Sequence, residues 1–253
     1  MSHVAINRDH WNADAPNWAT AGEHAWAAQT PSWGIWSTPD DEAPMIPADM
    51  SGLAAVELGC GTGYISAWMT RRGATVTGVD ISSEQLATAR RLSDKHTLAV
   101  TFIEANAEDT GLPAESFDFA ISEYGAATWC DPDLWLREAH RLLKPGGRLS
   151  FLTNHPLMLI TTPLSGDIND HTLHRPYRDL AVMDWTTAEV EPGGVSFTRP
   201  IAGWFALFRK IGFTVEDFRE LYAREDHEGV RFAVPADWAR DYPAELVWWL
   251  RKS

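Results

Sequence analysis

Three glycines alternate with Cys60 and Thr62 in the segment VELGCGTGY, residues 56–64. A glycine-rich turn between a strand and a helix presents backbone N–H groups to a ligand, and glycine lets that ligand approach the main chain closely. Such a turn suits an anionic or nucleotide-like group. Glu57 lies two residues before the first glycine, where its carboxylate would oppose a phosphate but attract an ammonium or sulfonium group.

The spacing of the glycines differs from that of two common phosphate-binding motifs. A dinucleotide site has glycine at the first, third and sixth positions of the turn, and the sixth position here is Tyr64. A P-loop ends in Gly-Lys-Ser or Gly-Lys-Thr, and no such residues follow Gly63. The sequence therefore disfavours both a dinucleotide-dependent oxidoreductase and a phosphate-binding P-loop.

A second acidic residue stands at the end of the next predicted strand. Asp80 closes the run ATVTGVD, residues 74–80, and a carboxylate at that position can accept hydrogen bonds from both hydroxyls of a ribose. A ligand that combines a ribose with a positive group and has no phosphate is S-adenosylmethionine. Together, Glu57 and Asp80 favour a sulfonium nucleoside as the ligand of the glycine loop.

An alternation of strands and helices is predicted to position these residues. We expect strands at 54–58, 74–80, 99–105, 116–125 and 147–154, and helices at 62–73, 84–96 and 131–147. Such an alternation predicts a parallel sheet with helices on both faces. Another helix is expected at 201–213. Two closing strands, at 214–223 and 245–251, are predicted to form an antiparallel hairpin at the sheet edge without a clear helix between them.

The predicted fold is one α/β domain of the Rossmann-like, doubly wound type. It has a seven-stranded, mostly parallel sheet with an antiparallel last strand. Residues 51–154 would form the cofactor-binding core, and residues 199–253 the C-terminal part of the sheet. Residues 1–50 and 155–198 show no sustained period and are predicted to be cap or lid segments. Five of the thirteen tryptophans fall within the first 36 residues, so we expect this irregular segment to help roof the acceptor pocket.

Four motifs in order resemble the class I S-adenosylmethionine-dependent methyltransferases. They are VELGCGTGY at 56–64, GVD at 78–80, EANAED at 104–109 and LKPGG at 143–147. The segment SEYGAATWCDP and the Tyr-Pro-Ala-Glu sequence before the basic C-terminal residues also resemble small-molecule methyltransferases of actinobacteria. The motifs cover about two-fifths of the chain.

The resemblance implies S-adenosyl-L-methionine as the cofactor and assigns roles to individual residues. Glu57 and the glycine loop would hold its methionine and ribose portions, and Asp80 would bind the ribose hydroxyls. Many relatives have Asp where this chain has Asn106, but an Asn oxygen can still accept a hydrogen bond from the adenine amine. The implied cofactor-binding residues are Glu57, Gly59, Cys60, Gly61, Thr62, Gly63, Asp80, Ile81, Asn106, Ala107, Glu108 and Glu123.

Candidate catalytic residues follow the fourth and fifth predicted strands, because open α/β sheets bind ligands beyond the carboxyl ends of their strands. Methyl transfer depends mainly on alignment, and a base is needed only if the acceptor must lose a proton. His155 is the candidate base, since histidine ordinarily titrates near neutral pH. Glu123 could orient an amine or a hydroxyl, and Tyr124 could contact the methionine portion or the acceptor. An ordinary structural role remains open for each.

The composition argues against several classes of partner. The net charge of -14, from 35 acidic and 21 basic residues, would repel a nucleic-acid backbone. No apolar run is long enough to span a membrane, and the first residues do not resemble a secretory signal. The two cysteines, Cys60 and Cys130, match no metal or redox spacing. We therefore expect a cytoplasmic enzyme and assign no metal.

The function predicted from the sequence is methyl transfer to an oxygen or nitrogen of a small-molecule acceptor. Two alternatives remain open. The first is methylation of a macromolecule, where the charge argues against tRNA but nothing argues against a protein. The second is an S-adenosylmethionine-binding module without catalysis. The sequence indicates neither the acceptor nor the oligomeric state.

Overall fold

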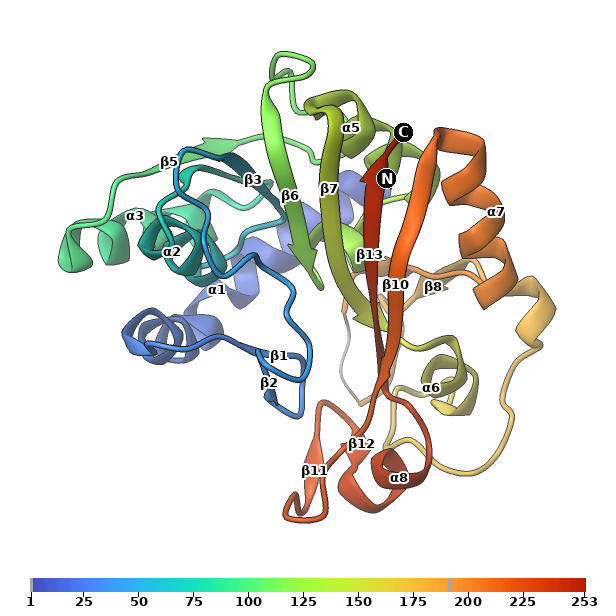
Figure 1. The fold of residues 1–253 in the computed structure, drawn as a ribbon. Helices are drawn as coiled ribbons and strands as arrows, with labels where there is room; N and C mark the ends of the chain where they lie inside the picture. The colour runs from blue at the N-terminus through green and yellow to red at the C-terminus, as the bar shows by residue number, and fades with distance from the viewer. Residues whose placement is uncertain (1, 191–192) are drawn as a thin grey trace.

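A seven-stranded sheet forms the centre of the computed structural model, which describes residues 2–190 and 193–253 (Figure 1). The strand order is β10-β13-β7-β6-β3-β4-β5. Strands β3, β4, β5, β6 and β7 all run parallel to one another. Strand β13 runs antiparallel to both β7 and β10. This confirms the predicted Rossmann-like fold. The strands are β3 (Ala54–Leu58), β4 (Thr75–Asp80), β5 (Val100–Glu104), β6 (Phe117–Glu123), β7 (Leu143–Asn154), β10 (Phe213–Leu221) and β13 (Glu245–Lys252).

Helices pack on both faces of this sheet. On one face, α5 and α7 bury Trp135 and Trp204 together with Trp248 of β13, and on the other face α2 buries Trp68 and Met69. No helix in the described part of the chain is both long enough and apolar enough to cross a membrane. The helices that flank the sheet strands are α2 (Tyr64–Arg71), α3 (Ser83–His96), α4 (Gly125–Trp129), α5 (Pro132–Leu142) and α7 (Ile201–Ile211).

Local sequence explains where the helices next to the site begin. The Ser82 hydroxyl accepts a hydrogen bond from the backbone N–H of Gln85 at the start of α3, and Asp131 caps α5 in the same way. The loop between β3 and α2 includes Gly59, whose φ is +75°. A Cβ atom on Gly59 would lie 2.5 Å from the backbone nitrogen of Ala126, so no larger residue fits where these two loops meet.

The first 27 residues are more regular than predicted. They contain α1 (His3–Ala27), a 25-residue helix that packs on α2 and α3 (Figure 1). Trp26 is fully buried there, and its indole N–H donates to the carbonyl of Thr62 at 2.7 Å. The expectation of an irregular segment was wrong because the apolar residues of α1 form no single stripe and Pro16 interrupts its pattern. Tertiary contacts stabilise this helix instead of a recognisable amphipathic face.

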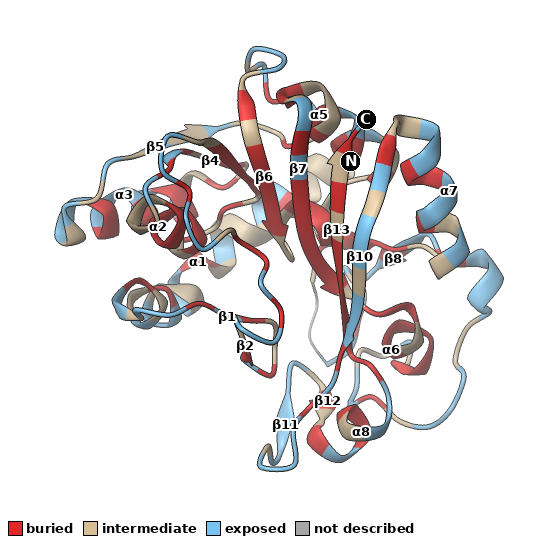
Figure 2. Cartoon of the chain, in the orientation of Figure 1, coloured by how far each residue is buried: buried red, intermediate tan, exposed pale blue. Residues whose placement is uncertain are grey.

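Three excursions from the sheet gather beyond the carboxyl ends of its parallel strands (Figure 1). Figure 2 shows that β6 and β7 are largely buried, whereas β11 is exposed. Between β10 and β13 the chain forms a small hairpin and α8, a helix that the sequence did not predict; the pairing of β10 with β13 confirms the predicted closing hairpin. The excursion elements are β1 (Ser32–Trp33), β2 (Thr38–Pro39), α6 (Pro156–Thr161), η1 (Tyr177–Asp179), β8 (Val182–Asp184), β9 (Val195–Phe197), β11 (Val230–Arg231), β12 (Val234–Pro235) and α8 (Ala236–Asp241).

Truncating Trp26 should destabilise the whole domain. Trp26→Ala removes a fully buried indole and its hydrogen bond to Thr62, so the free energy of unfolding should fall by about 3–5 kcal/mol. Urea denaturation measures this change, and Leu173→Ala, at an exposed residue, should stay within about 0.5 kcal/mol of the native protein. Equal stabilities of the two variants would show that α1 is a detachable cap.

Candidate functional site

A cavity of about 460 Å³ lies beyond the carboxyl ends of the parallel strands. Its volume is typical of sites for small molecules. Glu57 near the end of β3, Asp80 at the end of β4 and Glu123 at the end of β6 line one part of it. Trp18 of α1 and Phe232, between β11 and β12, line another part. The cavity therefore joins the glycine loop to the excursions that surround it.

Asp80 is held rigidly at the glycine loop. The backbone N–H of Gly61 donates to one carboxylate oxygen at 2.7 Å, and that of Ser82 donates to the other at 2.8 Å. Burial raises the pKa of Asp80, while these backbone hydrogen bonds lower it. Each oxygen keeps further acceptor capacity toward the cavity, which fits a pair of adjacent ribose hydroxyls.

Glu57 is almost fully buried beside the same loop. One of its oxygens accepts hydrogen bonds from the backbone N–H and the hydroxyl of Ser66, at 2.8 and 2.5 Å. Burial raises the pKa of Glu57 to about 8, and the nearby carboxyl groups of Glu123 and Asp80 add to this rise. Neither Lys nor Arg occurs among the described residues that line the cavity. A cationic ligand would stabilise these carboxylates, whereas a pyrophosphate would be repelled.

Gln85 is a site residue that the sequence did not indicate. Its side-chain oxygen is buried, has no hydrogen-bond partner within the described chain, and belongs to a residue that lines the cavity. A Cβ atom on Gly61 would lie 3.9 Å from it, so this oxygen is close to the glycine loop. A ligand hydroxyl or amine would satisfy the unpaired acceptor. A glutamine in the first turn of a helix is common, and therefore no motif marks this position.

Most of the residues implied to bind the cofactor come together in the structure. Gly63 is the exception: it precedes α2 and is not among the described residues that line the cavity. Glu108 is already engaged, because one of its oxygens accepts from the backbone N–H of Asp131 and pairs with His3, both at 2.7 Å. Those that line the cavity are Glu57, Gly59, Cys60, Gly61, Thr62, Asp80, Ile81, Asn106, Ala107, Glu108 and Glu123.

Glu123 has two hydrogen-bond donors that come from distant parts of the chain. The backbone N–H of Gly34 donates to one oxygen at 2.7 Å, and the hydroxyl of Tyr64 donates to the other at 2.6 Å. Burial raises the pKa of Glu123, while both hydrogen bonds lower it. Tyr64 occupies the position where a dinucleotide motif has glycine, and the structure uses its hydroxyl to orient Glu123.

Tyr124 also lines the cavity, with its hydroxyl bonded to a second buried carboxyl group. The hydroxyl donates to Glu245 of β13, which also accepts from the backbone N–H of Ile35 at 2.9 Å. Burial raises the pKa of Glu245 to about 8. The sequence did not indicate Glu245, which is 121 residues from Tyr124 and meets it only because β13 inserts beside β7.

His155 lies outside the group of described residues that line the cavity. Its Nδ1 accepts the backbone N–H of Leu157 at 3.0 Å and so caps α6, while its Nε2 lies 3.1 Å from a carboxylate oxygen of Glu220. Burial lowers the pKa of His155, and Glu220 opposes that effect. The geometry thus gives His155 a structural role and does not favour it as the general base.

Comparisons with known proteins agree with the fold. Residues 56–151 match the family model described as a methyltransferase domain. The ubiquinone biosynthesis O-methyltransferase of Pseudomonas syringae is 35% identical over 108 residues, which is 42% of this chain and 46% of that protein. The malonyl-[acyl-carrier protein] O-methyltransferase of Pectobacterium atrosepticum is 36% identical over 110 residues, 43% of this chain and 41% of that protein. The chain thus spans about half the length of these curated relatives.

A solved structure extends the similarity over most of the chain. The S-adenosylmethionine-dependent methyltransferase from Mesorhizobium loti is 26% identical, with a TM-score of 0.67 over 82% of this chain and 94% of that one. The family match and the fold together support the class that the motifs resemble, the class I S-adenosylmethionine-dependent methyltransferases. S-adenosylmethionine is the cofactor of that class, and the buried carboxyl groups and the unpaired Gln85 oxygen fit a cationic nucleoside.

The raised pKa of Glu57 predicts how stability changes with pH. In the folded state the carboxyl keeps its proton up to about pH 8, whereas an unfolded glutamate loses it near 4.5. The folded state therefore binds more protons in this window, and Glu57 makes stability fall as pH rises through it. Glu57→Gln removes that contribution, so the stability lost between pH 5.5 and 7.5 should be about 2 kcal/mol smaller than in the native protein.

Urea denaturation at the two pH values tests this expectation, with Glu189→Gln as an exposed control that should leave the pH dependence unchanged. The native protein should lose stability over the same window through Glu245 as well, because its pKa is also raised to about 8. An identical pH dependence in Glu57→Gln and the native protein would mean that Glu57 is already ionised in the folded state.

Proposed function

We propose that the protein transfers the methyl group of S-adenosylmethionine to an oxygen or nitrogen of a small acceptor held in this cavity. The main support for this proposal is that a single cavity connects the expected cofactor site with a space for the acceptor. The same space is lined by the acidic strand ends that suit the cofactor and by an apolar, aromatic region beyond them. Residues of α1 and of the β11–β12 hairpin line this space, which supports a small acceptor over a protein or tRNA.

The lining of the cavity supports an uncharged acceptor. It includes Trp11, Trp18, Trp185, Met158 and Phe232, which offer apolar and aromatic surfaces. A carboxylate or phosphate on the acceptor would have no Lys or Arg partner among the described lining residues and would face buried carboxyl groups. The curated relatives are named as O-methyltransferases, which favours an oxygen over a nitrogen.

Within this proposal Glu123 receives the proton of the acceptor hydroxyl. S-adenosylmethionine supplies a methyl carbon that its sulfonium already activates, so the protein mainly has to align the acceptor with it. Glu123 is held by Gly34 and Tyr64, and its carboxylate can accept a hydrogen bond from a hydroxyl in the cavity. Burial raises its pKa, which makes the ionised form a stronger base than an exposed glutamate.

The test is turnover with uncharged phenols, measured as release of S-adenosylhomocysteine. Glu123→Gln keeps the size and most hydrogen-bonding capacity of the side chain but cannot take a proton. We expect kcat to fall by about 100-fold or more, with affinity for S-adenosylhomocysteine changed by less than about threefold. In the native protein kcat should rise with pH as Glu123 ionises, and Glu123→Gln should lose that rise.

His155→Asn is the matched control, since asparagine can still cap α6. Its kcat should stay within about threefold of the native value. A loss as large as that of Glu123→Gln would support His155 as the base instead. A protein that binds S-adenosylhomocysteine but methylates neither hydroxyl nor amine acceptors would be a binding module, and the proposed activity would be wrong.

A further inference from the structure

The β11–β12 hairpin has a strained turn at its tip. Two residues, Phe232 and Ala233, connect the paired strands, and their φ angles are +47° and +60°. Positive φ at both central residues is characteristic of a type I′ turn, in which Asn-Gly is strongly preferred. Side chains with a Cβ atom are disfavoured in this conformation, and phenylalanine has no local interaction that would offset the cost. The residues of this turn are therefore ones that disfavour its backbone conformation.

Phe232 is also unfavourably exposed. The residue is 63% exposed, although its side chain is a large apolar ring. It lies parallel to the indole of Trp18, with an interplanar angle of 4° and ring centroids 5.9 Å apart. Both residues line the cavity. Packing in the hydrophobic core therefore cannot explain why a phenylalanine occupies this position or adopts this backbone conformation.

Contacts on both sides hold the strained turn in place. Before it, the guanidinium of Arg231 donates to the carbonyl of Ile35 at 3.1 Å and lies 5.2 Å from the ring centroid of Trp36. After it, the carbonyl of Ala233 accepts the backbone N–H of Asn169 at 2.8 Å. A sparsely populated conformation persists when its surroundings determine it in this way, and such positions cluster at functional sites.

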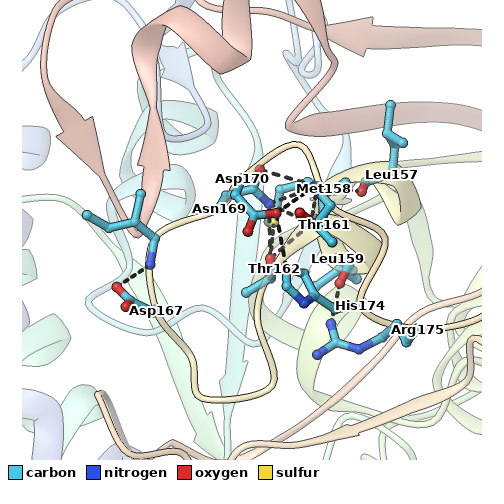
Figure 3. Close-up of polar contacts among 12 residues, drawn as sticks. Leu157, Met158, Leu159, Thr161, Thr162, Asp167, Asn169, Asp170, His174 and Arg175 are labelled. Atoms are coloured by element: carbon cyan, nitrogen blue, oxygen red, sulfur yellow. Dashed lines mark hydrogen bonds and ion pairs between the residues drawn. The ribbon is translucent and has the colours of Figure 1, made fainter.

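Asn169 connects the turn to the wall of the cavity. Figure 3 shows its side chain among the residues of α6, where its amide donates to the carbonyl of Met158 at 2.7 Å and to the hydroxyl of Thr161 at 3.0 Å. The same amide lies 3.2 Å from the hydroxyl of Thr162. Asn169 is buried, and Met158 and Thr162 line the cavity. One polar network therefore fixes both the cavity wall and the position of the turn.

We propose that Phe232 is a specificity-determining residue, which packs its ring with Trp18 against a planar, uncharged aromatic acceptor. The inference rests on the proposed function and names its substrate class, a phenol. Two parallel rings at the cavity offer flat apolar faces that a planar ring can contact and a puckered one cannot match. The exposed side chain and the strained turn are then maintained for contact with the acceptor.

The test replaces the turn with the sequence that its geometry prefers. The double substitution Phe232→Asn and Ala233→Gly relieves both positive φ angles and removes the ring. We expect Tm to rise by about 2–4 °C, while KM for 2-naphthol rises about 10-fold or more. The kcat and the affinity for S-adenosylhomocysteine should change by less than about twofold, because Phe232 is separate from the residues assigned to the cofactor.

Two single substitutions separate strain from recognition. Ala233→Gly should raise Tm and leave KM unchanged, because it keeps the ring. Phe232→Tyr should keep the native KM. The native protein should also bind 2-naphthol at least about 10-fold more tightly than its saturated analogue decahydro-2-naphthol, and the double variant should lose this preference.

Calorimetric binding of 2-naphthol in the presence of S-adenosylhomocysteine gives a readout that needs no turnover. If the native protein binds 2-naphthol in a Phe232-dependent way but does not methylate it, the proposed activity fails and this inference stands. The inference is overturned if the native protein does not bind 2-naphthol, if the double variant binds it as the native protein does, or if Ala233→Gly lowers Tm.

Discussion

Carboxyl groups buried without cationic partners are the constraint on which the rest of this site depends. Glu57, Asp80 and Glu123 lie at the ends of three neighbouring strands, and burial raises the pKa of each. Burying such groups is unfavourable unless hydrogen bonds or an opposite charge compensate. Backbone N–H groups and hydroxyls supply part of that compensation. A bound cation would supply the rest, so the same feature that destabilises the empty fold favours its ligand.

The donors to these carboxyl groups come from segments that are distant in sequence. Gly34 and Ile35 are consecutive, yet their N–H groups donate to Glu123 and Glu245 on different strands. One short stretch before the sheet therefore connects the base proposed for catalysis to the buried end of β13. The excursions around the cavity consequently do more than cover it, because they hold its polar groups in position and supply its apolar surfaces.

The sequence predicted the sheet and the acidic residues near its strand ends because local patterns mark them. A carboxylate at the end of a β-branched run, as at Asp80, is visible without a structure. The Gly34 donor to Glu123 could not be predicted, since it depends on how the segment before the sheet folds over it. The partners of His155 also could not be predicted: its position after a strand suggested catalysis, but its ring contacts the start of α6 and Glu220 on β10. The helix α1 was not predicted because its buried residues are scattered along the sequence and form no apolar stripe.

The place of β13 in the sheet has a consequence for how the chain reaches this fold. β10 precedes β13 in the chain but joins the sheet only through it, because β13 lies between β10 and β7. Until β13 is inserted, β7 presents an open edge and Tyr124 lacks its Glu245 partner. During synthesis on the ribosome, the nascent protein would therefore pass through a stage with an unprotected strand and an incomplete pocket, when chaperones have the most to shield.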